Sequence, residues 1–191
     1  MFDKIFEFEE TLSKFTGAPY TIATDCCTHA IELCFRYLNI TETHFTPYTY
    51  LSVPMLMKKL NVKYYHNDEQ WIGEYQFHNT PVYDSARRLE KDMYLPNTFQ
   101  CLSFGFDKPL NIGRGGAILT DNKEAYLKLK KMCYDGRDLK ISPWQNQKTF
   151  ELGYHYKMIP EEAEKGLVLL SNFKGERQDR QYPDLRQIDI L

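Results

Sequence analysis

Hydrophobic positions along the chain follow two alternating periods, which predict alternating helices and strands. Apolar residues spaced three and four apart predict helices over residues 2–15, 28–38, 52–60, 122–133 and 159–173. Short β-prone runs bounded by polar turn residues predict strands over residues 20–24, 43–45, 62–65, 80–83, 99–104 and 117–120. Residues 67–77 fit either a short edge strand or a helix, and residues 85–90 fit either a turn or a short helix.

Strands that alternate with helices are typical of an α/β protein. We therefore expect a three-layer α/β/α sandwich built on a mostly parallel sheet. The predicted elements place one domain over residues 1–173, in which Gly136 and Pro143 indicate a long loop over residues 135–148. The tail, residues 174–191, is charged and shows little apolar periodicity, so it resembles the beginning of an element that is not completed.

Composition and charge argue against several classes of function. The net charge of -2 provides no positive field that would attract nucleic acid. No run approaches the roughly 20 apolar residues that a membrane helix needs, and the charged N-terminus does not resemble a signal peptide. We therefore expect a cytoplasmic protein without nucleic-acid or membrane partners. The five cysteines lack the spacing of a disulfide framework or a zinc site, so no metal is expected.

Two charged residues follow predicted strands, at the edge where a parallel sheet places functional groups. Lys108 follows the strand over residues 99–104 and precedes the run Gly-Arg-Gly-Gly. It is either a solvated loop cation or an amine that forms a Schiff base. Asp84 follows the strand over residues 80–83, where it is either a turn residue or a functional carboxylate.

Two further features lie at the same predicted edge. Cys27 and Thr28 follow a strand and begin a helix, so they mark either an ordinary helix start or an anion site. Tyr50 also follows a strand, where it could pack in the core or stack on a planar ring. A phosphate cradle, a carboxylate, an aromatic platform and a lysine are together the parts of a pyridoxal 5'-phosphate (PLP) site.

A series of short motifs strengthens this interpretation. They are Thr-Asp-Cys-Cys-Thr-His-Ala (24–30), Pro-Tyr-Thr-Tyr (47–50), Asp-Ser-Ala-Arg (84–87), Ser-Phe-Gly-Phe-Asp-Lys (103–108), Gly-Arg-Gly-Gly (113–116), Asp-Gly-Arg (135–137) and Leu-Gly-Tyr-His-Tyr-Lys (152–157). In order and spacing they resemble the DegT/DnrJ/StrS-type aminotransferases, which are fold-type I PLP enzymes that act mainly on nucleotide-linked keto sugars. The resemblance covers roughly residues 8–170 and implies the large domain of a PLP-dependent transferase.

The resemblance implies a role for each matching residue. Lys108 would form the Schiff base with PLP and would later move a proton between the substrate carbon and the cofactor. Asp84 would pair with the pyridine nitrogen, and Tyr50 would stack on the ring. The residues that would hold the phosphate are Cys27, Thr28 and Ser103.

Three positions depart from the family pattern. Cys27 replaces a glycine, so a Cβ must be accommodated where the backbone approaches the phosphate. Arg87 replaces a glutamine on the side of the cofactor hydroxyl, where it would add a charge for a substrate carboxylate or phosphate. His155 replaces an asparagine that, by the resemblance, reaches the cofactor of a neighbouring subunit, which implies a homodimer with shared sites. Family members also continue into a small C-terminal domain, which residues 174–191 would only begin.

The leading hypothesis is a PLP-dependent aminotransferase. It would move an amino group from an amino acid donor such as glutamate to a keto acceptor, such as a nucleotide-linked keto sugar or a small keto acid. The retained Lys108 argues against the sugar dehydratase branch of the family, in which a histidine replaces this lysine. The alternative is a non-catalytic PLP-binding or dimerising remnant of the family. Another PLP reaction, such as racemisation or elimination, is a third possibility.

Overall fold

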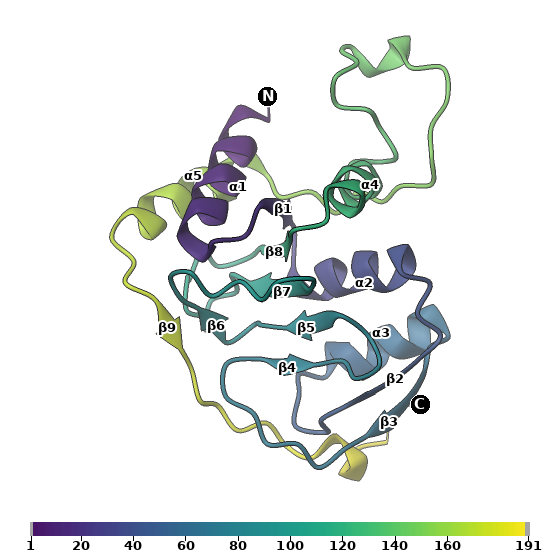
Figure 1. Cartoon of the computed structure of the whole chain (residues 1–191), viewed down its shortest axis with the longest axis vertical. Helices are drawn as coiled ribbons and strands as arrows, with labels where there is room; N and C mark the ends of the chain where they lie inside the picture. The colour runs from purple at the N-terminus through teal and green to yellow at the C-terminus, as the bar shows by residue number, and fades with distance from the viewer. Residues whose placement is uncertain (1, 190–191) are drawn as a thin grey trace.

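A central five-stranded sheet organises the computed structural model, which describes residues 2–189 (Figure 1). Its strand order is β1 (Tyr20–Thr24), β8 (Gly116–Thr120), β7 (Phe99–Ser103), β5 (Val82–Asp84) and β4 (Tyr75–Gln76). β7 and β5 pair in parallel, and the other three pairs are antiparallel. β1, β7 and β5 therefore run in one direction, while β8 and β4 run in the other. The sheet is mixed, which corrects the expectation of a mostly parallel sheet.

Two small two-stranded sheets extend this core. β2 (Glu42–Phe45) pairs in parallel with β3 (Lys63–His66). β6 (Arg88–Leu89) pairs antiparallel with β9 (Glu176–Arg177), which joins two segments far apart in the sequence. Residues 85–90 thus form a turn followed by a strand, so the short helix considered for this segment is wrong.

Helices cover both faces of the central sheet, so the α/β/α sandwich is confirmed (Figure 1). α1 (Asp3–Thr16) and α5 (Pro160–Ser171) pack on one face, while α2 (Cys27–Tyr37), α3 (Ser52–Leu60) and α4 (Lys123–Cys133) pack on the other. Successive strand residues point to opposite faces. Cys101 of β7 therefore joins the core beneath α2, and Leu102 joins the core beneath α1.

The predicted helices begin and end within two residues of the observed ones. The larger difference concerns the tail. After α5 the chain is mostly extended, forms β9 and a short 3-10 helix (Leu185–Gln187), and passes along the β5–β4 side of the molecule (Figure 1). The long loop after α4 contains one further 3-10 turn (Trp144–Asn146). The domain boundary at residue 173 stays a prediction.

No helix within residues 2–189 is both long and apolar enough to cross a membrane. The cytoplasmic location stays a prediction.

Candidate functional site

A cavity of about 590 Å³ opens where β5 and β7 end. Its walls come from the start of α2, the segment that leads into α3, the loop after β7 and the C-terminal tail. Seven of the eight predicted site residues line it: Cys27, Thr28, Tyr50, Asp84, Arg87, Ser103 and Lys108. The parallel pairing of β5 and β7 explains this convergence, because parallel neighbours end at the same edge of a sheet.

The first turn of α2 forms one wall of the cavity. The Cys27 side chain is buried, and its thiol lies 3.4 Å from the Cys101 carbonyl oxygen and 3.9 Å from Asp84 Oδ1. Its Cβ is therefore accommodated on the sheet side. Burial raises the pKa of the Cys27 thiol well above its usual value, so the thiol stays neutral. Thr28 Oγ1 lies 2.7 Å from the Ser52 hydroxyl, which links the starts of α2 and α3.

Gly116 allows β8 to approach this turn. A Cβ at Gly116 would lie 2.6 Å from the carbonyl carbon of Cys26 and from the backbone nitrogen of Cys27. It would also lie 2.8 Å from the Leu102 carbonyl oxygen. Because all three atoms belong to the backbone, no side-chain movement would relieve the clash. The glycine run after Lys108 is thus needed in part for packing between β8 and α2.

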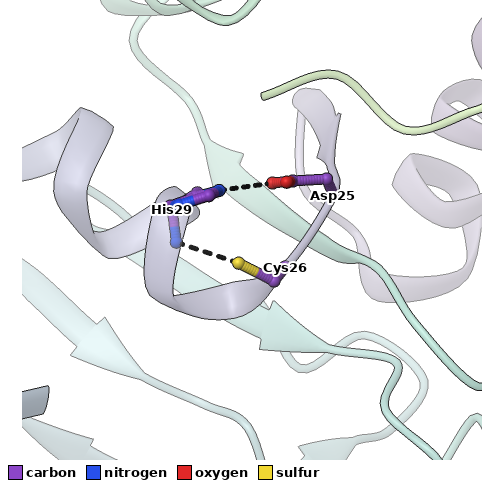
Figure 2. A group of neighbouring side chains, drawn as sticks. All are labelled: Asp25, Cys26 and His29. Atoms are coloured by element: carbon purple, nitrogen blue, oxygen red, sulfur yellow. Dashed lines mark hydrogen bonds and ion pairs between the residues drawn. The ribbon is translucent and has the colours of Figure 1, made fainter. Parts of the chain in front are cut away.

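Asp25, Cys26 and His29 form a compact cluster at the outer side of the same turn (Figure 2). His29 Nδ1 lies 2.7 Å from Asp25 Oδ1, and the His29 backbone N–H donates to Cys26 Sγ over 3.4 Å. Partial burial lowers the pKa of His29, but its hydrogen bonds with Asp25 and Cys26 outweigh this and raise the pKa to about 9. At neutral pH the imidazole is therefore protonated.

The cluster also has the spacing of a metal site, since one ligand atom from each side chain lies within 4.8 Å of the others. One feature disfavours a cation there, because the N-terminus of α2 is itself positive. The expectation that the chain holds no metal stays a prediction.

Asp84 lies at the floor of the cavity and is only 5% exposed. Its carboxylate accepts hydrogen bonds from the Tyr75 hydroxyl (3.0 Å) and from the Ala86 backbone N–H (3.0 Å). Among residues 2–189 it has no ion-pair partner within 4.0 Å. Burial raises the pKa of Asp84, against the opposing effect of the hydrogen bonds and of Lys108. A buried carboxylate without an ion pair suits a cationic group that enters the cavity.

Lys108 faces the same cavity from the loop after β7. Its side chain is 12% exposed, and its Nζ lies 3.9 Å from Asp107 Oδ1. The Nζ also donates to the Tyr182 hydroxyl over 3.4 Å. The turn that carries it is closed by a hydrogen bond from the Lys108 backbone N–H to the Gly105 carbonyl oxygen. Lys108 is thus held in the cavity wall rather than extended into solvent.

Arg87 is buried and already paired, so it does not offer the open charge expected from the sequence. It donates to the backbone and carboxylate oxygens of Asp107, each over 2.6 Å, and to Gln178 Oε1 over 2.8 Å. Its Nε donates to the Tyr182 hydroxyl over 3.1 Å. Burial lowers the pKa of Arg87, but the bonds to Asp107 and Tyr182 outweigh it and raise the pKa.

Two predicted residues stand apart from this buried network. The Tyr50 ring is 62% exposed at the rim of the cavity, where a planar ligand could stack on it. The His155 side chain is 76% exposed, lies outside the cavity and pairs with Asp135 over 3.0 Å. The prediction that His155 serves a neighbouring subunit stays untested by a single chain.

The residues that the sequence did not reveal come mainly from the tail. Arg180, Tyr182, Pro183 and Leu185 line the cavity, although the tail lacks apolar periodicity. Tyr75, which binds Asp84, lies in the segment that could not be assigned as helix or strand. The one sequence signal for Tyr182 is that it is the single aromatic residue of the tail, residues 174–191.

The sequence model of the DegT/DnrJ/EryC1/StrS aminotransferase family matches residues 1–65 and 95–183. The matched segments contain Lys108 and Ser103, whereas Asp84 and Arg87 lie between them. The placement of Asp84 therefore depends on the geometry of the cavity. No curated protein sequence matches the chain significantly.

Solved structures share the fold at low sequence identity. The sugar aminotransferase CalS13 from Micromonospora echinospora has a TM-score of 0.75 and 14% identity over 90% of this chain and 61% of its own. DesI, solved with its TDP-sugar product, has a TM-score of 0.71 and 20% identity over 89% and 53% of the two chains. The PLP-form of Spr1654 from Streptococcus pneumoniae has a TM-score of 0.70 and 18% identity over 89% of this chain and 59% of its own. The chain thus spans 53–61% of the length of these structures.

Proposed function

The chain belongs to the DegT/DnrJ/EryC1/StrS aminotransferase family, and on that basis we propose that it is a PLP-dependent aminotransferase with Lys108 as the residue that binds the cofactor covalently. One observation carries the proposal: a buried carboxylate without an ion pair, Asp84, and a lysine amine line the same cavity. The cavity is of ordinary size for a cofactor site, about 590 Å³.

The residues present fit PLP at three points. Asp84 would hold the ring nitrogen in its protonated form, which would also supply the missing partner of this carboxylate. The N-terminus of α2, with Cys27, Thr28 and the Ser103 hydroxyl, would hold the phosphate through backbone N–H and hydroxyl donors. Tyr50 would cover one face of the ring. PLP supplies an aldehyde that condenses with amines and a ring that withdraws electrons.

Each residue then has a defined task. Lys108 would bind the aldehyde carbon through Nζ, with loss of water, and after release would carry a proton to and from the substrate carbon. Asp84 would keep the positive charge on the ring nitrogen. The neutral Cys27 thiol would add no charge next to the phosphate, since burial raises its pKa. Arg87, held in place by Asp107, would shape the wall beside Lys108.

We further propose glutamate as the amino donor and a nucleotide-linked keto sugar as the acceptor. Support for the acceptor comes from a related fold, since DesI was solved with a TDP-sugar product. An aromatic wall of Tyr50, Trp71 and Tyr182 would suit a sugar ring or a base. Because the chain spans only part of the related structures, both substrates need direct measurement.

A homodimer with shared sites is also proposed. The cavity rim carries large exposed apolar side chains, among them Tyr50 (62%) and Phe106 (78%), which a second copy would cover. His155 would then approach the neighbouring site. Light scattering should report a dimer, and His155→Ala should weaken PLP binding in that dimer. A monomer that binds PLP as tightly as the dimer would contradict this proposal.

The test is spectroscopic. PLP added to the purified protein should give a visible absorbance band, which Lys108→Ala should lack and the exposed control Lys148→Ala should keep. Glutamate, or another donor in a screen, should convert the band to that of the pyridoxamine form. A band that no donor converts would favour a PLP-binding module without turnover. A protein that stays colourless with PLP would rule out the proposed function.

A further inference from the structure

The C-terminal segment 176–188, which we call the strap, runs from β9 to the last 3-10 helix of the described chain (Figure 1). It is attached on both sides of the cavity. On one side β9 pairs with β6, and the Gln178 backbone N–H donates to the Arg87 carbonyl oxygen over 2.8 Å. On the other side Leu185 is buried, and its backbone N–H donates to the Pro47 carbonyl oxygen over 3.2 Å. Tyr182 lies between these two attachments and lines the cavity.

The ring of Tyr182 is held by aromatic contacts. It stacks on the Trp71 ring, with centroids 6.0 Å apart and planes 15° from parallel. The Trp71 indole N–H donates to the Tyr48 carbonyl oxygen over 2.7 Å, so the platform is itself fixed. The Arg87 guanidinium lies 5.6 Å from the centre of the Tyr182 ring.

The hydroxyl of Tyr182 ends between two cations. Its oxygen accepts hydrogen bonds from Arg87 Nε (3.1 Å) and from Lys108 Nζ (3.4 Å). A phenol oxygen accepts two hydrogen bonds at most, so the acceptor capacity of the Tyr182 oxygen is used. The Tyr182 O–H remains as a donor, and no acceptor for this O–H lies among the described residues. Through this oxygen the strap contacts the amine of Lys108 directly.

We propose that Tyr182 is a positioning residue for Lys108, a role that rests on the proposed function of Lys108 in binding the cofactor. In the free protein its oxygen holds Nζ at the cavity wall. Its ring, braced on Trp71, covers the cavity from the strap side and excludes water from the amine. The sheet edge supplies Lys108, and the strap sets where its amine lies.

The role has a consequence for how fast the amine reacts. Lys108 also faces Asp107 in its own loop, and Asp107 in turn pairs with Arg87 and with Arg180 of the strap. The Tyr182 oxygen holds Nζ by a hydrogen bond. Removing this oxygen alone should therefore free the amine and make it react faster.

Competitive acetylation measures this without any cofactor. Acetic anhydride acylates amines, and mass spectrometry reports the rate at each lysine at one fixed pH. Lys148, exposed and outside the cavity, is the internal reference. In Tyr182→Phe, which keeps the ring, the acetylation rate of Lys108 relative to Lys148 should rise about threefold. Tyr65→Phe, outside the cavity, should leave this ratio unchanged.

Tyr182→Ala removes the cover as well and should raise the acetylation rate of Lys108 about tenfold relative to Lys148. If Lys108 reacts in both Tyr182 variants as it does in the unsubstituted protein, the positioning role is wrong. The proposed function is tested separately, because added PLP should protect Lys108 from acetylation. If PLP does not protect Lys108, the proposed function is wrong, but the role of Tyr182 in holding the amine is not affected. Circular dichroism confirms that each variant is folded.

Discussion

The two sides of the cavity are built in different ways. The sheet side consists of residues at the ends of β5 and β7 and at the start of α2, which strand pairing and the core hold in place. The strap side consists of an extended segment held by a few hydrogen bonds, one buried leucine and exposed ion pairs such as Arg186 with Asp68. The sheet side is therefore expected to fix the chemistry, and the strap side to adjust access and position.

The largest effect is expected at Asp84, which has a chemical role on the sheet side. Asp84→Asn keeps the shape but removes the charge that would hold the ring nitrogen protonated. Conversion of the PLP band by glutamate should slow by about 10²-fold or more. Thermal stability should not fall, because the change removes a buried charge without an ion pair. Stopped-flow absorbance measures the rate, with the exposed Asp92→Asn as control, and an unchanged rate would contradict the role of Asp84.

The next effect concerns the packing of the sheet side. Gly116→Ala should destabilise the protein by about 2–3 kcal/mol, because its Cβ would meet backbone atoms of Cys26, Cys27 and Leu102. Gly105→Ala is the matched control, since its Cβ would meet only side-chain atoms at 3.6 and 3.8 Å. It should change the free energy of unfolding by about 0.5 kcal/mol at most. Urea denaturation of both variants measures the difference, and equal midpoints would refute the close approach.

A smaller effect should depend on pH at the start of α2. The pKa of His29 is raised from 6.5 to about 9 in the folded chain. The resulting stabilisation is complete below about pH 6.5 and is lost as pH rises through 9. It should be of the order of 1 kcal/mol because the cluster is partly solvated. Urea denaturation at pH 6 and pH 9.5 should give converging stabilities for the unsubstituted protein and His29→Gln. A constant difference would exclude the raised pKa.

The smallest effect is expected at the outer end of the strap. Arg186 pairs with Asp68 and Asp184, but its side chain is 41% exposed, and solvent and salt screen such pairs. Arg186→Ala should leave the melting temperature and PLP binding close to those of the unsubstituted protein. Differential scanning fluorimetry with and without PLP tests this. A large loss of either would mean that the strap is held by charge rather than by β9 and Leu185.

The same contrast explains what the sequence could predict. Lys108, Asp84 and the Cys27–Thr28 turn each follow an apolar strand, so periodicity places them at one edge of the sheet, and their order resembles a family motif. β8 and β4 reverse the sheet direction because β7 connects to β8, and β4 to β5, without a helix that would cross back over the sheet. A pattern of alternating helices and strands does not reveal this. Beyond β9, the strap forms no element that periodicity could reveal, because its backbone bonds to single positions at the cavity rim such as the Pro47 carbonyl oxygen. Tyr182 was therefore missed, and the pairing of Arg87 with Asp107 was missed with it.

Chemical trapping tests most directly whether Lys108 binds the cofactor covalently. The protein is mixed with PLP, reduced with borohydride, digested and mapped by mass spectrometry. We expect one dominant pyridoxyl adduct, located on Lys108 and absent from Lys108→Ala. An adduct on another lysine, equal labelling of surface lysines, or no adduct at all would contradict it.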